Sequence, residues 1–274
     1  MKVFVVHVPG ADESDVRHTV EGLQGLGVEA VETHRDVEVE LKDAGLVLTL
    51  GGDGTFLAGA RLAAPHGIPI LGVNLGRLGF LTELESVDLL DGLRRFLAGD
   101  YRIEERTMLQ VTLLRQGHSM VQQIGLNEVV VDHTGEARIL RLEIDVSGQA
   151  VGVIDADGAI VATASGSTAY ALASGGPILE PTLEDLILVP MSPFALTVRP
   201  IVFAPAQVVT LTVVRGPAEM RIDGTRHGHR VATGDSVRCG AHPRRLKVVR
   251  FSSPESFYQR LAAKLGWGRP LVPK

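Results

Sequence analysis

Apolar positions in the first hundred residues fall into short continuous runs separated by longer amphipathic stretches. The apolar runs lie at residues 3–8, 28–31, 46–50 and 68–73. Runs of this length between polar turns are typical of strands that are buried on both faces of a parallel sheet. The amphipathic stretches have helical spacing and end at glycine or proline, which predicts helices at about 12–26, 55–64 and 86–97. The pattern therefore predicts an α/β domain with a mostly parallel sheet.

The pattern changes after Tyr101, where strand-like runs follow one another with only short turns between them. The predicted strands lie at residues 102–114, 122–131, 140–146 and 158–163, with several more between 197 and 251. Helical patterns are confined to residues 167–174, where small residues allow a helix to begin, and to residues 254–265. This arrangement predicts a second domain that is all-β, mostly antiparallel and sandwich-like.

The composition of the 274 residues narrows the function classes. A net charge of −5 gives no basic footprint for non-specific binding of nucleic acid, so we expect no nucleic-acid partner. Cys239 is the only cysteine, which excludes an intrachain disulfide and a cysteine-based zinc site. Aromatic residues make up 4% and glycine occurs 31 times, so the cores must be aliphatic and the turns must depend on glycine.

Nothing in the sequence indicates a membrane or an export signal. The chain opens on a strand-like run without the pattern of a signal peptide. The longest apolar stretch, residues 195–214, is interrupted by Arg199, Pro200 and Pro205, so we expect two buried strands there and no membrane span. We therefore expect a cytoplasmic protein. Walker A and G-x-G-x-x-G patterns are also absent, so nucleotide chemistry would need a different loop.

The strongest chemical signal is Gly-Gly-Asp-Gly-Thr at residues 51–55, between an apolar strand and a helix. The glycines let the backbone approach a ligand closely, and the N-terminus of the following helix favours an anion. The carboxylate of Asp53 is an unusual neighbour for a phosphate unless it accepts a proton from a hydroxyl or holds a metal. The alternative is a tight turn in which Asp53 serves only as the helix N-cap.

Two weaker signals follow. A second glycine loop at residues 72–81 comes after the next strand, so it would leave the same carboxyl edge of the sheet, where open α/β sheets bind ligands. An ordinary turn explains this loop equally well. Asn127 and Glu128 stand side by side and have the groups to bind ribose hydroxyls or a base edge, although an exposed strand start also accounts for them.

A third segment combines small residues with one aromatic ring. Residues 164–169 leave backbone and hydroxyl groups uncovered, and Tyr170 supplies a flat ring that suits an adenine or a nicotinamide. The alternative is a close-packed start of a helix. His227 and His229 look like a metal pair, but no third ligand lies near them in the sequence, so we assign no protein metal ligands.

Together these segments resemble the NAD kinase family. The matching motifs lie at residues 51–55, 74–81, 127–128, 157–158, 166–170, 175–177 and 264–267. They occur in the family's order from residue 51 to the C-terminus, over about four-fifths of the chain. Lipid kinases and phosphofructokinases share the first motif, whereas Asn-Glu and Gly-Ser-Thr-Ala-Tyr are much more specific.

The resemblance implies a two-domain fold with the site in a cleft between the domains. Residues 1–99 and 253–274 would form the N-terminal α/β domain that carries the glycine loop, with the last helix packed back on it. Residues 100–252 would form the C-terminal β-rich domain that binds the dinucleotide.

The resemblance also implies the reaction and the residues that perform it. ATP, with Mg²⁺ or another divalent cation, would phosphorylate the adenosine ribose 2′-hydroxyl of NAD to give NADP. The sequence leaves open whether polyphosphate can replace ATP as the donor. Asp53 would be the catalytic base that accepts the hydroxyl proton. The expected substrate-binding residues are Gly52, Gly54, Thr55, Phe56, Asn74, Asn127, Glu128, Arg138, Asp157, Thr168, Ala169, Tyr170, Ala171, Leu172 and Ala173. Family members are commonly homodimers or homotetramers, and we expect one of these states.

The sequence departs from the family pattern at three places. Ala164-Ser165 replaces the Pro-Thr often found before Gly-Ser-Thr-Ala-Tyr, Asp155 stands where many bacterial members have a basic residue, and Thr225 stands where glutamine is common. These departures concern substrate contacts, including tolerance for NADH, and not the reaction. Two alternatives stay open: a lipid kinase that shares the first motif, and a module that senses NAD(P) without consuming ATP.

Overall fold

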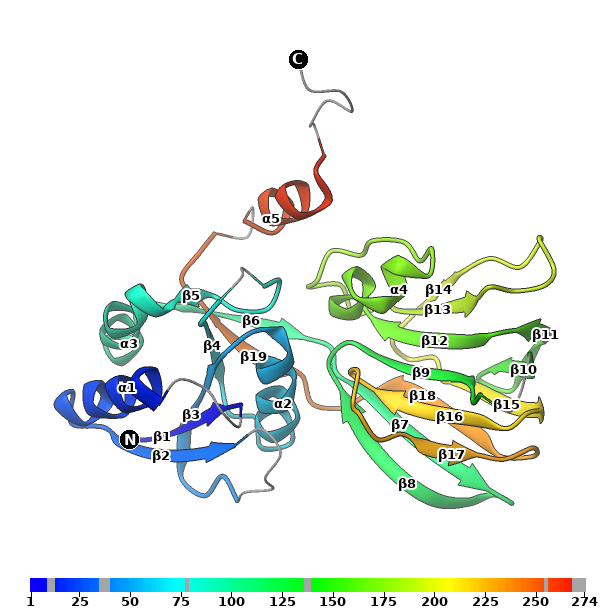
Figure 1. The fold of residues 1–274 in the computed structure, drawn as a ribbon, viewed down its shortest axis with the longest axis horizontal. Coiled ribbons are helices and arrows are strands. Elements are labelled where there is room, and N and C mark those ends of the chain that lie inside the picture. Colours follow the sequence, from blue (N-terminus) through cyan, green and yellow to red (C-terminus); the bar gives the residue numbers. More distant parts are fainter. Residues whose placement is uncertain (9–12, 35–39, 77–78, 136–138, 254–255, 268–274) are drawn as a thin grey trace. The chain divides into compact units, whose positions relative to one another are not determined.

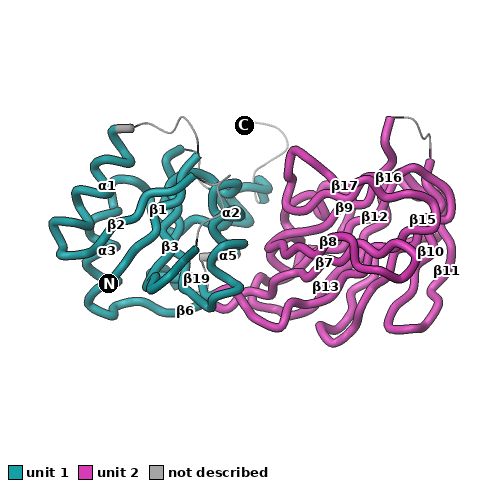
Figure 2. The backbone as a smooth tube through the Cα atoms, turned by 90° about the horizontal axis from the view of Figure 1, so that it is seen from below, with its two compact units in different colours: residues 1–104, 247–274 teal, residues 105–246 magenta. Residues whose placement is uncertain are grey.

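The computed structural model describes residues 1–274 apart from 9–12, 35–39, 77–78, 136–138, 254–255 and 268–274. The chain forms two compact units, one of residues 1–104 with 247–274 and one of residues 105–246 (Figure 2). The first unit contains a parallel sheet with helices and the second is made almost entirely of antiparallel strands. The predicted fold class is therefore confirmed.

The first unit is built on a seven-stranded sheet (Figure 1). The strand order is β2-β1-β3-β4-β19-β6, with β5 paired to β4. The pairings of β1 with β2 and β3, and of β4 with β3, β5 and β19, are all parallel. The strands are β1 (Lys2–His7), β2 (Glu29–His34), β3 (Ala44–Leu50), β4 (Ile70–Asn74), β5 (Leu84–Glu85), β6 (Arg102–Arg106) and β19 (Leu246–Arg250).

Helices cover both faces of this sheet. The buried leucines of β3 share a core with α1 (Glu13–Gly25) and α3 (Leu89–Leu97). On the opposite face, Gly59 of α2 (Asp53–Ala63) approaches β3 so closely that a Cβ there would lie 2.4 Å from Thr49 Cγ2. Because successive strand residues point to opposite faces, a strand covered on both sides is apolar throughout, as the sequence of β3 predicts.

Shorter elements complete the first unit. The 3₁₀ turn η1 (Ala64–His66) follows α2, and η2 (Ser86–Asp88) leads directly into α3, so the helix predicted at 86–97 begins as a 3₁₀ turn. The last helix, α5 (Ser256–Leu265), buries Phe257 and Leu261. This helix belongs to the first unit although it follows the strands of the second in sequence.

The second unit consists of two six-stranded antiparallel sheets. Their orders are β11-β10-β15-β18-β7-β8 and β14-β13-β12-β9-β16-β17. Alternate residues of both sheets point inward and form one aliphatic core, as in a β-sandwich. The strands are β7 (Leu109–Arg115), β8 (His118–Gly125), β9 (Glu128–His133), β10 (Leu140–Val146), β11 (Gln149–Ala156), β12 (Gly158–Thr163), β13 (Leu186–Met191), β14 (Ile201–Phe203), β15 (Val209–Arg215), β16 (Ala218–Ile222), β17 (His229–Val231) and β18 (Ser236–Ala241).

Several predicted strands differ from those observed. The single strand predicted at 102–114 is two strands, because β6 joins the sheet of the first unit while β7 pairs with β8 and β18. The strand predicted at 122–131 is interrupted by Leu126 and Asn127, which connect β8 to β9. The helix expected at 167–174 is a 3₁₀ turn, η3 (Ser165–Thr168), followed by the single turn of α4 (Tyr170–Ala173).

The expectation of two buried strands at residues 195–214 is wrong for its first half. The strand there, β14, is only three residues long, and Ile201 and Val202 are 37% and 47% exposed. Phe194 and Leu196 are more than four-fifths exposed and lie outside any strand. β14 is an edge strand of its sheet, so it lacks a neighbour on one side.

Candidate functional site

Two glycine loops leave the same edge of the sheet in the first unit. β3 and β4 are parallel neighbours, and the Gly51 N–H donates to the Val73 carbonyl at 2.9 Å. Gly51 has a φ of 145°, which side chains rarely allow, and a Cβ there would lie 2.5 Å from Thr55 Oγ1. The turn after β3 therefore requires glycine at this position.

Asp53 joins the two loops. Its carboxylate accepts the N–H of Phe80 at Oδ2 and the N–H of Leu81 at Oδ1, both at 3.0 Å. The N-cap of α2 is Gly52, which makes no side-chain cap, so the alternative in which Asp53 is only the helix N-cap is wrong. Gly79 passes so close that a Cβ would lie 2.0 Å from Asp53 Oδ1. The carboxylate is thus held between the start of a helix and the opposite loop.

This arrangement can bind a phosphate and accept a hydrogen bond from a hydroxyl. The N-terminus of α2 presents N–H groups without intrahelical acceptors at the positive end of the helix dipole, which favours a phosphate. Each oxygen of Asp53 accepts one backbone N–H, and a carboxylate oxygen can accept more than one hydrogen bond. Asp53 therefore keeps the capacity to accept a hydrogen bond from a hydroxyl placed beside it.

The other predicted residues of the first loop divide into exposed and buried positions. Gly52 and Gly54 are exposed, whereas Thr55 and Phe56 are only 2% and 1% exposed. The Phe56 ring fills the space over Gly72, where a Cβ would lie 2.6 Å from the ring. Gly52 and Gly54 are therefore accessible to a ligand, while the side chains of Thr55 and Phe56 support the loop from within.

Asn74 stabilises the start of the second loop. It is 4% exposed, and its Nδ2 donates to the Gly76 carbonyl at 2.8 Å. Its Oδ1 is buried and accepts no hydrogen bond from the described residues. Asn74 thus makes a structural contact through its amide nitrogen and leaves one buried acceptor without a partner among the described residues.

A second group of polar residues gathers at one end of three adjacent strands, β12, β9 and β16, in the second unit. The Thr163 N–H donates to the Asn127 carbonyl, and the Asp223 N–H donates to the Glu128 carbonyl, both at 2.9 Å. Gly166 lies against Asn127 so closely that a Cβ would be 2.1 Å from the Asn127 carbonyl oxygen. The structure thus brings Asn127 and Glu128 together with the segment that follows β12.

Asp223 holds this turn and is a residue that the sequence did not single out. Its Oδ1 accepts the N–H groups of Asn127 and Glu128 at 2.8 and 3.2 Å, and its Oδ2 accepts that of Leu126 at 2.9 Å. It has a φ of 49°, which is uncommon for a residue other than glycine. The only local signal for this residue is the Asp-Gly pair that follows a strand of alternating apolar and polar residues. Such pairs mark ordinary turns as well, so the signal does not indicate a functional role.

Asn127 and Glu128 both present unused polar atoms. They are 9% and 5% exposed, and Asn127 Oδ1 and Glu128 Oε2 have no hydrogen-bond partner in the described part of the chain. Burial, reinforced by the negative charge of Asp223, raises the pKa of Glu128 to about 8, although the Tyr170 N–H bound to its carboxylate acts in the opposite direction. Glu128 is therefore mostly protonated at neutral pH and able to donate a hydrogen bond.

The predicted segment of residues 168–173 continues from this turn. Thr168 Oγ1 donates to the Ser165 carbonyl at 3.3 Å, and the Tyr170 ring is 44% exposed while its N–H reaches Glu128. Ala171 is buried in a small core on the outer face of the sheet. Ala169 and Leu172 are half-buried and Ala173 is exposed. The segment therefore offers an exposed aromatic residue whose backbone N–H bonds the Glu128 carboxylate.

One predicted residue lies apart from this group, and another cannot be placed. Asp157 precedes β12, at the end opposite to Thr163, and its N–H donates to the Met191 carbonyl at 3.0 Å. A strand of six residues spans about 20 Å, so Asp157 lies far from Asn127 within this chain. Arg138 lies outside the described residues.

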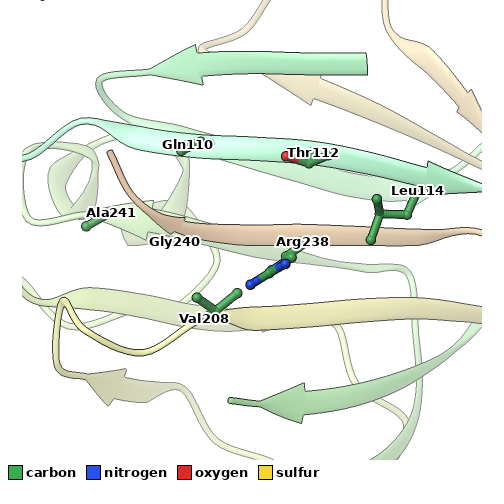
Figure 3. Close-up of a pocket in the computed structure, with 7 residues that line it drawn as sticks. All are labelled: Gln110, Thr112, Leu114, Val208, Arg238, Gly240 and Ala241. Atoms are coloured by element: carbon green, nitrogen blue, oxygen red, sulfur yellow. The ribbon is translucent and has the colours of Figure 1, made fainter. Parts of the chain in front are cut away.

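A hollow of about 310 Å³ lies elsewhere in the second unit, on the outer face of the sheet that contains β7 and β18 (Figure 3). None of the described residues that line it was predicted to bind a substrate. It is lined by Gln110, Thr112, Leu114, Val208, Arg238, Gly240 and Ala241.

The described part of the chain contains neither a cluster of metal ligands nor a membrane-spanning helix. No three or more His, Cys, Asp or Glu side chains of the described ranges lie together as a metal site. Outside the gaps in those ranges, no helix is long and apolar enough to cross a bilayer.

Comparisons with known proteins agree with the motifs. Residues 10–101 match the family model of the ATP-NAD kinase N-terminal domain, and residues 126–251 match that of the ATP-NAD kinase C-terminal domain. The NAD kinase of Heliobacterium modesticaldum is 46% identical over 231 residues, covering 84% of this chain and 81% of that protein. The NAD kinase of Geotalea daltonii is 40% identical over 229 residues, covering 83% and 80%.

Solved structures show the same fold. The NAD kinase of Archaeoglobus fulgidus in complex with ATP superposes with a TM-score of 0.78 at 27% identity, covering 97% of this chain and 99% of that one. Yeast NADH kinase complexed with NADH superposes with a TM-score of 0.89 at 19% identity, covering 100% and 89%. Both family models, the similarity of these relatives over most of their length and the shared fold establish that the chain belongs to the NAD kinase family.

Proposed function

We propose that this protein is an NAD kinase that transfers the γ-phosphoryl group of ATP to the adenosine ribose 2′-hydroxyl of NAD. The observation that carries the proposal is the Asp53 carboxylate, fixed by two backbone N–H groups at the N-terminal end of α2, which favours an anion. A lone carboxylate in such a turn suits a reaction that brings a phosphate and a hydroxyl together. The family membership agrees with this reaction.

In the proposed step, the 2′-oxygen of NAD attacks the γ-phosphorus of ATP. The bond between that phosphorus and the β,γ-bridging oxygen breaks, ADP leaves, and the hydroxyl proton passes to Asp53. Because the transition state for phosphoryl transfer is loose, positioning of the hydroxyl contributes more than its deprotonation. The two N–H groups that fix Asp53 supply this positioning.

The substrate NAD is proposed to bind at the second-unit turn. Asn127 Oδ1 accepts hydrogen bonds, protonated Glu128 donates them, and the exposed Tyr170 ring offers a face for a base or nicotinamide. Thr168 and the residues up to Ala173 supply backbone and small side chains beside them. The roles of Asp157 and Arg138 stay predictions from the resemblance.

Magnesium is proposed to enter as part of the ATP complex and to neutralise charge on the phosphates. Mg²⁺ commonly keeps several waters and takes only one or two carboxylates besides substrate phosphates. The region of Asp53 fits this need, because it offers one carboxylate and backbone groups and not a cage of ligands. The proposal therefore requires no metal site built from protein side chains alone.

The test is to incubate the purified protein with NAD and ATP–Mg²⁺ and to detect NADP with an NADP-specific dehydrogenase. Parallel reactions contain diacylglycerol or a sphingoid base in place of NAD, or polyphosphate in place of ATP. NADP formation supports the proposal. Phosphorylation of lipid with NAD unchanged favours the lipid kinase, and NAD binding without consumption of ATP favours a sensing module.

Two variants attribute the activity to this chain. Asp53→Asn should abolish most NADP formation, whereas Asp91→Asn, which alters an exposed carboxylate in the first turn of α3, should leave it unchanged. Equal activity in both variants would show that Asp53 is not the catalytic carboxylate.

A further inference from the structure

The first unit contains a deeply buried cation that substrate binding does not explain. Arg250, at the end of β19, is 1% exposed. Its Nε donates to Glu104 Oε1 at 3.0 Å, and its Nη1 donates to Glu83 Oε2 at 3.1 Å. Its Nη1 also donates to the Leu81 carbonyl at 3.0 Å. The guanidinium therefore bonds two carboxylates and one backbone carbonyl at once.

Leu81 connects this cation to the site. The carbonyl of Leu81 accepts from Arg250, and its N–H donates to Asp53 Oδ1 at 3.0 Å. The backbone of one residue thus lies between the buried guanidinium and the carboxylate. A shift of Leu81 would move a hydrogen-bond donor of Asp53, and the neighbouring donor, Phe80, belongs to the same short stretch of backbone.

The surroundings of Arg250 hold this end of the loop firmly. Glu83 Oε1 accepts the N–H groups of Phe251 at 2.8 Å and Ser252 at 2.6 Å, directly after β19. The loop is therefore hydrogen-bonded to the end of β19 and the residues after it at two points, the Leu81 carbonyl and the Glu83 carboxylate. A guanidinium suits the centre of this arrangement, because its donors diverge in a fixed plane, whereas the ammonium of lysine is a single point charge.

We propose that Arg250 is a positioning residue for the reaction, acting on Asp53 through the backbone of Leu81. The proposal rests on the proposed function, in which Asp53 orients and deprotonates the hydroxyl. Arg250 touches no substrate in this scheme. It fixes the loop so that the N–H groups of Phe80 and Leu81 meet the carboxylate at hydrogen-bond distance.

A purely structural role for Arg250 makes a different prediction. If the arginine only neutralises two buried carboxylates, any variant that disturbs this charge balance should lower stability without a specific effect on turnover. Glu104→Gln is the matched control, since it removes a buried charge that bonds Arg250 but leaves the contact between Arg250 and Leu81 in place.

The experiment compares Arg250→Lys with Glu104→Gln in NADP formation. Lysine keeps a positive charge, but its one ammonium is drawn to Glu83 and Glu104 in preference to the neutral carbonyl of Leu81. We expect Arg250→Lys to lower kcat about 10- to 100-fold with KM for NAD and ATP nearly unchanged, because misplacing a catalytic group by an ångström has effects of this size. We expect Glu104→Gln to keep kcat close to that of the unaltered protein.

Arg250→Lys in an Asp53→Asn background distinguishes a positioning effect on Asp53 from a nonspecific loss of activity. Arg250→Lys should change the residual kcat very little there, because the group that it positions is already disabled. An equal loss in both backgrounds, an unchanged kcat in Arg250→Lys, or an equal loss in Glu104→Gln would overturn the proposal. Full activity of Asp53→Asn would instead refute the role of Asp53 in the proposed function.

If Arg250→Lys does not fold, the double variant Arg250→Met/Glu104→Gln replaces it. This pair removes a positive and a negative charge together, and Glu83 keeps the two backbone N–H groups of Phe251 and Ser252. The double variant also lacks the contact with Leu81. A fall in its kcat at constant KM supports the proposal, and a kcat equal to that of Glu104→Gln overturns it.

Discussion

The two units hold their central carboxyl groups in opposite ways. In the first unit both oxygens of Asp53 accept a backbone N–H, so the group is fixed in place. In the second unit Glu128 has a buried oxygen without a partner in the described ranges, and its pKa is raised to about 8. The comparison shows two ways of holding a carboxyl group: backbone N–H donors fix the carboxylate of Asp53, whereas burial keeps Glu128 mostly neutral.

Both carboxyl groups depend on contacts that come from distant parts of the chain. Asp53 is held by Phe80 and Leu81, which follow it in the sequence by 27 and 28 positions. The turn at Glu128 is held by Asp223, which follows Glu128 by 95 positions. These contacts suggest variants that disturb one unit while leaving the other unit intact. Such variants test whether turnover and dinucleotide affinity are separable.

Among the variants that alter the support of a carboxyl group and not the group itself, the largest effect is expected from Gly79→Ala in the first unit. The added Cβ would lie 2.0 Å from Asp53 Oδ1, so the carboxylate or the loop has to move. We expect kcat for NADP formation to fall about 100-fold, with the Kd for NAD nearly unchanged. Gly76→Ala is the control, since a Cβ there meets nothing within 4 Å, and it should keep kcat. Equal kcat in the two variants would contradict the role of this loop.

A smaller effect is expected from Asp223→Asn in the second unit. The amide keeps one acceptor oxygen but loses the other, which weakens the bonds to the N–H groups of residues 126–128. We expect the Kd for NAD to rise about tenfold, which corresponds to roughly one lost hydrogen bond to a charged group, while kcat at saturating NAD stays close to normal. Titration calorimetry gives the Kd. A lower kcat with unchanged Kd would reverse the assignment of the two units.

The smallest effect is a dependence of NAD affinity on pH. The pKa of Glu128 is raised from 4.5 to about 8, so the group stays protonated below that pH and loses its proton as the pH rises through it. If the protonated acid donates a hydrogen bond to NAD, affinity should be constant near pH 6 and should weaken several-fold above pH 8. Glu128→Gln should remove this dependence. An affinity of the unaltered protein that is independent of pH would argue against the donor role.

The same shift predicts the pH dependence of stability. A carboxyl group whose pKa is raised in the folded state binds its proton more tightly there than in the unfolded chain, so its contribution is present at low pH and is lost as the pH rises through about 8. Glu128→Gln should therefore flatten the decline of Tm between pH 5 and pH 9. An identical decline in both proteins would show that other groups cause it.

The fold could be predicted from the sequence where the hydrophobic pattern is strong. β3 and β4 are buried on both faces, and their continuous apolar runs mark them clearly. β11 and β13 were missed for identifiable reasons. β11 follows a two-residue turn in which Ser147 and Gly148 have φ of 52° and 84°, typical of a type I′ hairpin turn, and it is mostly exposed. β13 contains Pro190, and a proline in a sequence argues against a central strand. The sheet accommodates Pro190 because it lies beyond the residues of β13 that pair with β14.

The residues of the candidate site likewise fall into those that local sequence indicates and those that only the structure reveals. Asp53 could be predicted because three glycines, a strand and a helix surround it within a few residues. Asp223 and Arg250 could not, since their partners are 95 to 97 and 146 to 169 positions away in the sequence. Contacts of this kind arise only when the strands are paired. Local motifs thus indicate the groups that are proposed to meet the substrate, and the structure adds the distant groups that bond to the same loops and turns.

The central claim is that Asp53 serves the chemical step while the second unit binds the dinucleotide. The most direct measurement is the rate of a single turnover when ATP–Mg²⁺ is added to NAD already bound by the Asp53→Asn variant. We expect a Kd for NAD close to that of the unaltered protein and a rate lower by about 10²- to 10⁴-fold, the usual contribution of a general base. A rate close to that of the unaltered protein, with NAD equally well bound, would show that Asp53 does not serve the chemical step.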